Sequence, residues 1–145
     1  MRHVTQEGLD IIKHHEGFSS KVYICPAGYP TIGYGHLILS HEDFGEGITK
    51  LQAEDLLRHD VRIAEHAVLR LITVPLTDNQ FNALVSFTFN LGGGALQRST
   101  LRRVINRGNH AGVPQQLMRW VWANGRKLNG LIRRRKDEAA LYQAS

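Results

Sequence analysis

The sequence has little of several features that define whole classes of protein. Its 145 residues include one cysteine, which excludes an internal disulfide framework and a cysteine-rich zinc site. No apolar run approaches the roughly 18 residues that a membrane-spanning helix needs. The N-terminus has early acids and no apolar stretch typical of a secretory signal peptide. We therefore expect synthesis in a cytoplasm, with no signal peptide or membrane anchor, and any export to depend on another protein.

Acidic residues are scarce in the second half of the chain. Residues 1–78 carry 11 acids and 7 Lys or Arg, whereas residues 79–145 carry 2 acids and 11 Lys or Arg. The densest basic run is Arg133 to Lys136. Such a surface suits an anionic membrane, an acidic cell-wall polymer or nucleic acid, or it is simply a solvated helix face. Because no zinc-finger or ribonucleoprotein-type motif is present, we expect no nucleic-acid partner.

The hydrophobic pattern predicts short strands near the N-terminus. Residues 5–15 have the apolar spacing of a short amphipathic helix. Residues 18–39 then interleave Phe, Val, Tyr, Ile and Thr with proline and glycine, as in short strands joined by tight turns. We therefore expect a small β-lobe over about residues 18–48.

The rest of the chain is typical of helices. Thr49 and Thr77 are each followed by a glutamine three residues later, which is the pattern of a capping box at a helix start. The first of these helices is expected to connect the lobes over residues 49–73, because Pro75 bars its continuation. A helical lobe is expected over about residues 76–145. The predicted fold class is α+β, one domain with a cleft between two lobes that suits an extended ligand.

Helix signals recur in the basic half. Ser99 is a good N-cap, and Pro114 suits a first helical turn. The helix that Pro114 opens is expected to run to Trp122, whose ring we expect in the core. A last helix is expected over residues 131–142.

Three polar residues near the predicted strands form a candidate hydrolytic set. Glu16 lies at the predicted end of the first helix beside apolar Phe18, a setting that keeps a proton available for donation. Cys25 follows nine residues later, and Thr31 six further on, beside a Gly-Tyr-Gly turn. An acid, a nucleophilic or polar group and a hydroxyl that holds a water suit hydrolysis. The same three also read as a surface acid, a small buried hydrophobe and a strand residue.

This spacing resembles that of the phage-type lysozymes, the endolysin family that includes the T4-like and lambdoid enzymes. Glu16, Cys25 and Thr31 match the family's Glu, its Asp or Cys, and its Thr. Thr31 also opens a Thr-Ile-Gly-Tyr-Gly-His segment that ends at His36. Further similar segments cover nearly the whole chain, at residues 87–92, 99–101, 120–122 and 130–138.

The resemblance implies a muramidase that cuts the β-1,4 bond between N-acetylmuramic acid and N-acetylglucosamine in peptidoglycan. Glu16 would be the general acid. Cys25 would be the second catalytic group in place of the commoner aspartate, and would have to ionise or act through water. Thr31 would orient the attacking water.

The resemblance also implies supporting residues. His36 would support the active-site lobe and Asn90 would line the sugar cleft, although Asn90 is also placed to cap a helix near Gly92. One C-terminal arginine would hold Glu16, and the spacing favours Arg134 over its two neighbours. No cofactor and no metal ion are expected, because His14 and His15 would point about 100° apart on a helix and could not easily share a site.

Two other functions remain open. Cys25 as nucleophile with His36 as base would make a cysteine-dependent amidase or peptidase acting on the same polymer. The basic C-terminal stretch would alternatively disrupt anionic membranes, or give a lysozyme contact with an anionic outer membrane. We further expect a monomer that reaches the wall through a holin-type pore.

Overall fold

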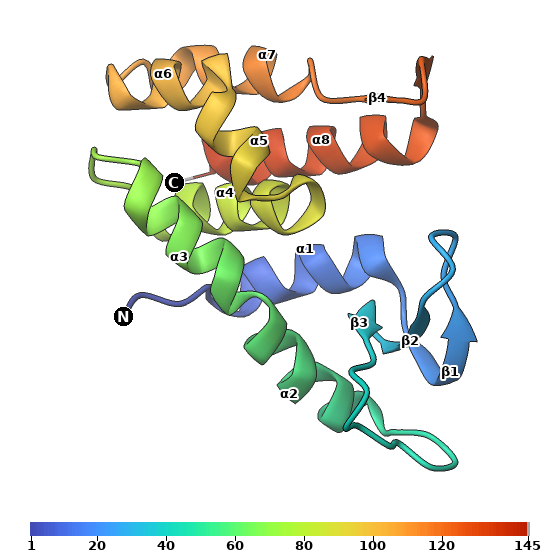
Figure 1. Ribbon diagram of the computed structural model, residues 1–145. Helices are drawn as coiled ribbons and strands as arrows, with labels where there is room; N and C mark the ends of the chain where they lie inside the picture. The colour runs from blue at the N-terminus through green and yellow to red at the C-terminus, as the bar shows by residue number, and fades with distance from the viewer. Residues whose placement is uncertain (145) are drawn as a thin grey trace.

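A three-stranded sheet near the N-terminus is followed by a long run of helices (Figure 1). The computed structural model describes residues 1–144, and the predicted helical lobe extends to residue 145, outside that range. In chain order the elements are α1 (Gln6–Glu16), β1 (Ser19–Ile24), β2 (Pro30–Gly33), β3 (His36–Leu37), α2 (Lys50–Asp60), α3 (Arg62–Leu71), α4 (Asp78–Leu91), α5 (Gly93–Arg98), α6 (Thr100–Asn106), the 3₁₀ helix η1 (His110–Gly112), α7 (Val113–Leu117), β4 (Trp122–Ala123), β5 (Arg126–Lys127) and α8 (Asn129–Gln143).

The predicted strands form one antiparallel sheet in the order β1-β2-β3. The central strand β2 pairs Thr31 with Tyr23 on one side and with Leu37 on the other. Backbone pairing on both edges holds β2 firmly, and three of its four residues are buried. A side chain on this strand is therefore presented from a rigid position.

The segment between sheet and helices is two helices rather than the single helix expected over residues 49–73. The division is at Val61, where ψ is −12°, well away from the usual helical value. α2 packs against β2 and β3, whereas α3 packs against α4 and α5. The two helices therefore pack their apolar faces against different neighbours. Figure 1 shows the pair running diagonally from the sheet to the helices.

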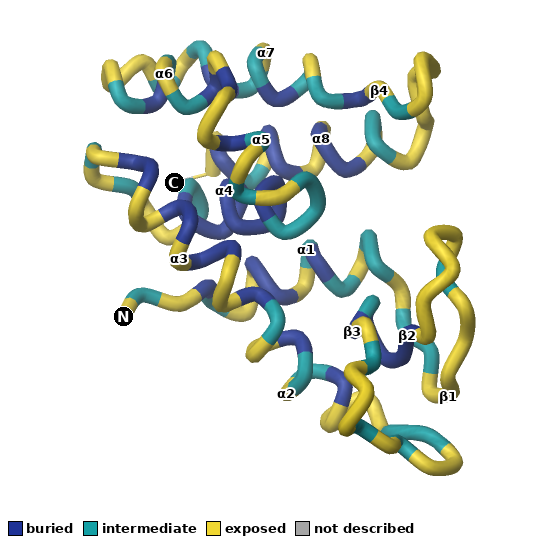
Figure 2. The backbone as a smooth tube through the Cα atoms, in the orientation of Figure 1, coloured by how far each residue is buried: buried dark blue, intermediate teal, exposed yellow. Residues whose placement is uncertain are grey.

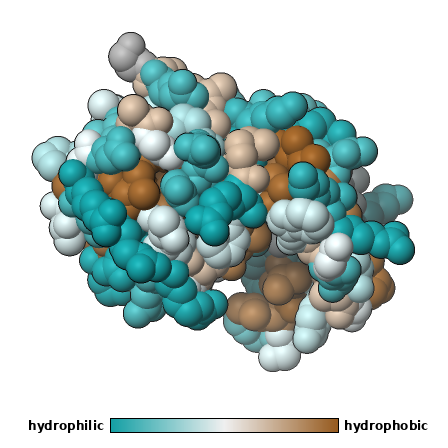
Figure 3. Space-filling view, turned by 90° about the horizontal axis from the view of Figure 1, so that it is seen from above, coloured by the Kyte–Doolittle hydropathy of each residue, from teal (hydrophilic) through white to brown (hydrophobic). Residues whose placement is uncertain are grey.

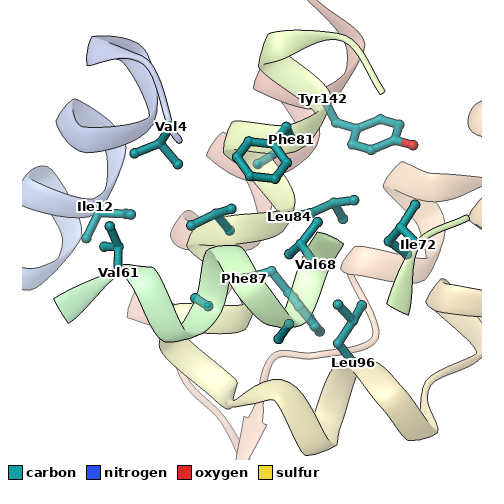
Figure 4. Packing of buried hydrophobic residues seen from close by; sticks show 14 of the residues in the cluster. Val4, Ile12, Val61, Val68, Ile72, Phe81, Leu84, Phe87, Leu96 and Tyr142 are labelled. Atoms are coloured by element: carbon teal, nitrogen blue, oxygen red, sulfur yellow. The ribbon is translucent and has the colours of Figure 1, made fainter. Parts of the chain in front are cut away.

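The main hydrophobic core surrounds α4, which contacts α1, α3, α5 and α8. Phe81, Leu84 and Phe87 of α4 are each no more than 1% exposed. In Figure 4, Val68 of α3 lies beside Leu84, and Ile12 of α1 lies beside Val61. Figure 2 shows the same concentration of buried residues along α4.

The two predicted capping boxes are confirmed. The Thr49 and Thr77 hydroxyls accept hydrogen bonds from the backbone N–H groups three residues later, and each glutamine side chain accepts one from the backbone N–H of its threonine.

The basic half departs from expectation around Trp122. The helix that Pro114 opens ends at Leu117, and Trp122 lies on a small β4–β5 hairpin, 57% exposed with the Lys127 ammonium 5.3 Å from its ring centre. Asn124 and Gly125 both adopt positive φ, as a two-residue hairpin turn requires. The Asn124-Gly125 turn therefore makes this segment a hairpin rather than the end of a helix.

No helix among residues 1–144 combines the length and the apolarity needed to cross a bilayer.

Two further features concern the glycines and Ser99. Gly92 ends α4 as its C-cap with φ 94°, and the two glycines that follow it begin the short helix α5. Ser99 caps α6 as predicted, because its hydroxyl accepts the Arg102 backbone N–H at 3.0 Å.

Candidate active site

A cleft of about 920 Å³ lies between the sheet, the α2–α3 segment and the ends of α1 and α4. Five of the six residues predicted for the site line it: Glu16, Cys25, Thr31, His36 and Asn90. The sixth, Arg134, lines an adjoining hollow of about 620 Å³, which shares Glu16 and Asn90 with the cleft. Residues far apart in the chain therefore line two adjoining hollows that have Glu16 in common.

The Glu16 carboxyl is held from one side and left open on the other. Its Oε2 accepts a hydrogen bond from Arg134 Nη1 at 2.9 Å, and the Arg134 side chain is only 5% exposed against 24% for Glu16. The other oxygen faces Gly35, where a Cβ would lie 3.0 Å from Oε1. Gly35 has φ 81°, so a glycine there serves both the turn and the space beside Glu16.

Arg134 is fixed by a buried network between α4 and α8. Its Nη2 donates to the Ser86 carbonyl at 3.2 Å and its Nε lies 3.4 Å from Glu138 Oε2, to which the Ser86 hydroxyl donates at 2.6 Å. Burial raises the pKa of Glu138, and the neighbouring arginines oppose that shift. Neither Ser86 nor Glu138 was expected from the sequence to have a role at the site. Glu138 follows Arg134 by four residues, which is the spacing of an ion pair on one helix face. This spacing can be seen in the sequence and could have predicted the pair.

The two neighbours of Arg134 point elsewhere. Arg133 is exposed, whereas Arg135 is fully buried, donates to Asn90 Oδ1 and lies 5.1 Å from the Phe87 ring centre. Burial lowers the pKa of Arg135 to about 10, so it is still a cation at neutral pH. Asn90 lies within α4, whose C-cap is Gly92. Asn90 therefore does not cap the helix, and Arg135 orients its side-chain amide at the edge of the cleft.

Cys25 follows the end of β1, and Thr31 lies opposite on β2. A hydrogen bond from the Tyr29 backbone N–H, followed by one involving the Thr31 hydroxyl, lowers the pKa of the Cys25 thiol. The Thr31 hydroxyl donates to the Tyr29 carbonyl at 2.9 Å. A hydroxyl has only one proton, and Thr31 gives its proton to the Tyr29 carbonyl. The Tyr29 N–H is therefore the main donor to the Cys25 sulfur. The Thr31 oxygen keeps a free lone pair that can accept a hydrogen bond from water.

His36 is held between two acids on different segments. Its Nδ1 lies 2.8 Å from Asp60 of α2, and its Nε2 lies 2.9 Å from Glu42 of the loop after β3. Both ring nitrogens are therefore engaged, and neither is free to take a proton from Cys25. This arrangement does not support the cysteine amidase or peptidase, and it ties the sheet to α2 through His36.

The His36 contacts predict a pH-dependent contribution to stability. Burial disfavours the charged imidazole, but hydrogen bonds and charge from Asp60 and Glu42 outweigh it and raise the pKa of His36. A folded-state pKa above the unfolded value of about 6.5 gives stability that is complete below about pH 6.5 and is lost as the pH rises through the folded pKa. His36→Gln is therefore expected to lower Tm more at about pH 6 than at about pH 8.5. Differential scanning calorimetry at both pH values checks this, and an equal loss at both would contradict it.

Comparisons with known proteins identify the family of this chain. The phage lysozyme family model matches residues 13–138. The chain is 40% identical to the endolysin of Acyrthosiphon pisum secondary endosymbiont phage 1, over 99% of both chains. It is 39% identical over 96% of its length to the endolysin of Bacillus phage B103, but spans only 53% of that protein. The muramidase domain of SpmX from Asticaccaulis excentricus superposes with a TM-score of 0.89 at 37% identity, covering 99% of this chain and all of that one. The chain belongs to the phage lysozyme family.

Proposed function

We propose that this protein is an endolysin that hydrolyses the β-1,4 bond between N-acetylmuramic acid and N-acetylglucosamine in bacterial peptidoglycan. The observation that carries the proposal is the Glu16 carboxyl, held by buried Arg134 at the edge of a cleft that Cys25 and Thr31 also line. Relatives named endolysin and a structural neighbour named muramidase support the same reaction.

Each residue then has a step in the hydrolysis. Glu16 gives its proton to the glycosidic oxygen as the bond from that oxygen to the sugar C1 breaks. A water molecule held by the Thr31 hydroxyl forms the new bond to C1, and its proton passes to the Cys25 thiolate. One water is consumed, and exchange with solvent returns the proton to Glu16. Arg134 keeps the carboxyl oriented throughout.

Mass spectrometry of digested peptidoglycan tests the reaction. We expect soluble muropeptides with reducing N-acetylmuramic acid ends. Reducing N-acetylglucosamine ends or anhydro-muramic ends would mean a different glycan-cleaving reaction, and freed stem peptides with intact glycan would contradict a glycosidase altogether.

Substitutions of Cys25 test its role in the second half of the reaction. Cys25→Ala removes the group that accepts the water proton, so the rate is expected to fall about 10²-fold. Cys25→Asp supplies a carboxylate at the same position and should keep activity close to that of the parent. Release of soluble muropeptides measures both rates. A Cys25→Asp variant as inactive as the alanine variant, while folded, would contradict a proton-accepting role.

We also propose that the basic half contacts an anionic outer membrane. Four arginines line a hollow of about 530 Å³, and none of them forms an ion pair within residues 1–144. They are Arg98 of α5, Arg102 and Arg103 of α6, and Arg107 directly after α6. The face of the molecule on the side of α6 and α7 is largely hydrophilic, with apolar patches between (Figure 3). Arg103→Glu with Arg107→Glu is expected to reduce cosedimentation with lipopolysaccharide vesicles several-fold, without changing muropeptide release from isolated wall. Unchanged cosedimentation would contradict this contact.

A monomer and release through a holin-type pore remain predictions. Light scattering coupled to size exclusion checks the first. Lysis on expression with and without a holin checks the second.

A further inference from the structure

A cluster outside the proposed reaction lies where the end of α1 meets α8. His14 and His15 of α1 and Asp137 of α8 each offer one ligand atom, and these atoms all lie within 4.8 Å of one another. His15 Nε2 is 2.8 Å from Asp137 Oδ2, and the His14 ring stands edge-on to the His15 ring with centroids 4.9 Å apart. Adjacent histidines were expected to diverge. The edge-on rings and a carboxylate from a second helix instead bring three donors together.

The donor set has the chemistry of a transition-metal site. Imidazole nitrogens and a carboxylate oxygen suit Zn²⁺, with bonds of about 2.0–2.2 Å, whereas Mg²⁺ and Ca²⁺ prefer oxygen alone. Bonds of that length place tetrahedral ligand atoms about 3.4 Å apart. The widest separation in the cluster, at most 4.8 Å, therefore has to shrink by at most about 1.4 Å. His14 is exposed and the Asp137 side chain is 51% exposed, so both can make that shift without disturbing the core.

We propose that His14, His15 and Asp137 bind one Zn²⁺ ion, with water as the fourth ligand. The ion would tie the end of α1, which carries Glu16, to α8, which carries Arg134. Both histidines also line the hollow that adjoins the cleft. The simpler alternative is that His15 and Asp137 form an ordinary hydrogen-bonded pair with His14 in solvent.

Calorimetric titration of the full chain without an affinity tag distinguishes the two. We expect saturable binding of one Zn²⁺ per chain, at least tenfold weaker in His14→Ala and in Asp137→Asn. Saturating Zn²⁺ should raise Tm by about 3 °C or more in the parent and by much less in either variant, because a ligand that binds only the folded state stabilises it. Mg²⁺ at the same concentration should give neither effect.

His66→Ala is the matched control, because it removes a single exposed histidine from α3, away from the cluster. It should bind Zn²⁺ like the parent. Absence of saturable binding would overturn the proposal, as would parent-like affinity in both His14→Ala and Asp137→Asn. The titration contains no peptidoglycan, so its failure is separate from any failure of the proposed hydrolysis.

Discussion

Glu16→Gln is expected to lower the rate of muropeptide release about 10³-fold while leaving the fold intact. The amide cannot supply a proton to the leaving oxygen, and loss of a general acid costs about 10²–10⁴-fold in rate. The glutamine carbonyl can still accept the hydrogen bond that Glu16 Oε2 takes from Arg134. Initial rates on purified peptidoglycan, together with thermal unfolding of both proteins, measure the effect.

The matched control for this substitution is Asp10→Asn. Asp10 is an exposed acid on the same helix, and among residues 1–144 its carboxylate accepts a side-chain hydrogen bond only from the nearby Gln6 amide. It should retain the parent rate. A folded Glu16→Gln protein with undiminished activity would remove Glu16 from the reaction and the proposed mechanism with it.

Arg134→Met is expected to give the largest loss of stability. It leaves Glu138, which is fully buried, with Ser86 and Arg135 as its only partners among the described residues, and it releases Glu16 at the cleft. Removing one partner from a buried charged network costs about 3 kcal/mol or more. For a chain of this size that corresponds to a fall in Tm of about 10 °C. Activity measured at a temperature where both proteins are folded should also fall, because the Glu16 carboxyl loses its orientation.

Arg133→Met is the control, since it removes the neighbouring exposed arginine and the same charge. Its Tm should stay within about 2 °C of the parent, because exposed charges contribute little. Equal losses in the two variants would show that net charge, rather than the buried contacts of Arg134, sets the stability.

Local signals in the sequence predicted most of the element starts. Both capping boxes and the Ser99 cap act within three residues of themselves, so no tertiary contact is needed to recognise them. The Asn124-Gly125 turn was equally local, but the apolar spacing after Pro114 favoured a helix and hid it. The break between α2 and α3 at Val61 had no such local signal, and the two helices pack against different neighbours.

The proposed active site likewise combines features that the sequence predicts with features that depend on the tertiary structure. The sequence by itself determined the fold class and, through the spacing of Glu16, Cys25 and Thr31, the family. Only the tertiary structure decided which arginine meets Glu16, that both His36 nitrogens are occupied, and that two adjacent histidines converge with Asp137. The physical reason is that α8 reaches Glu16 across more than a hundred residues of chain. Spacing along one helix gives the direction of a side chain, but only the packing of α8 on α4 and α1 fixes what it touches.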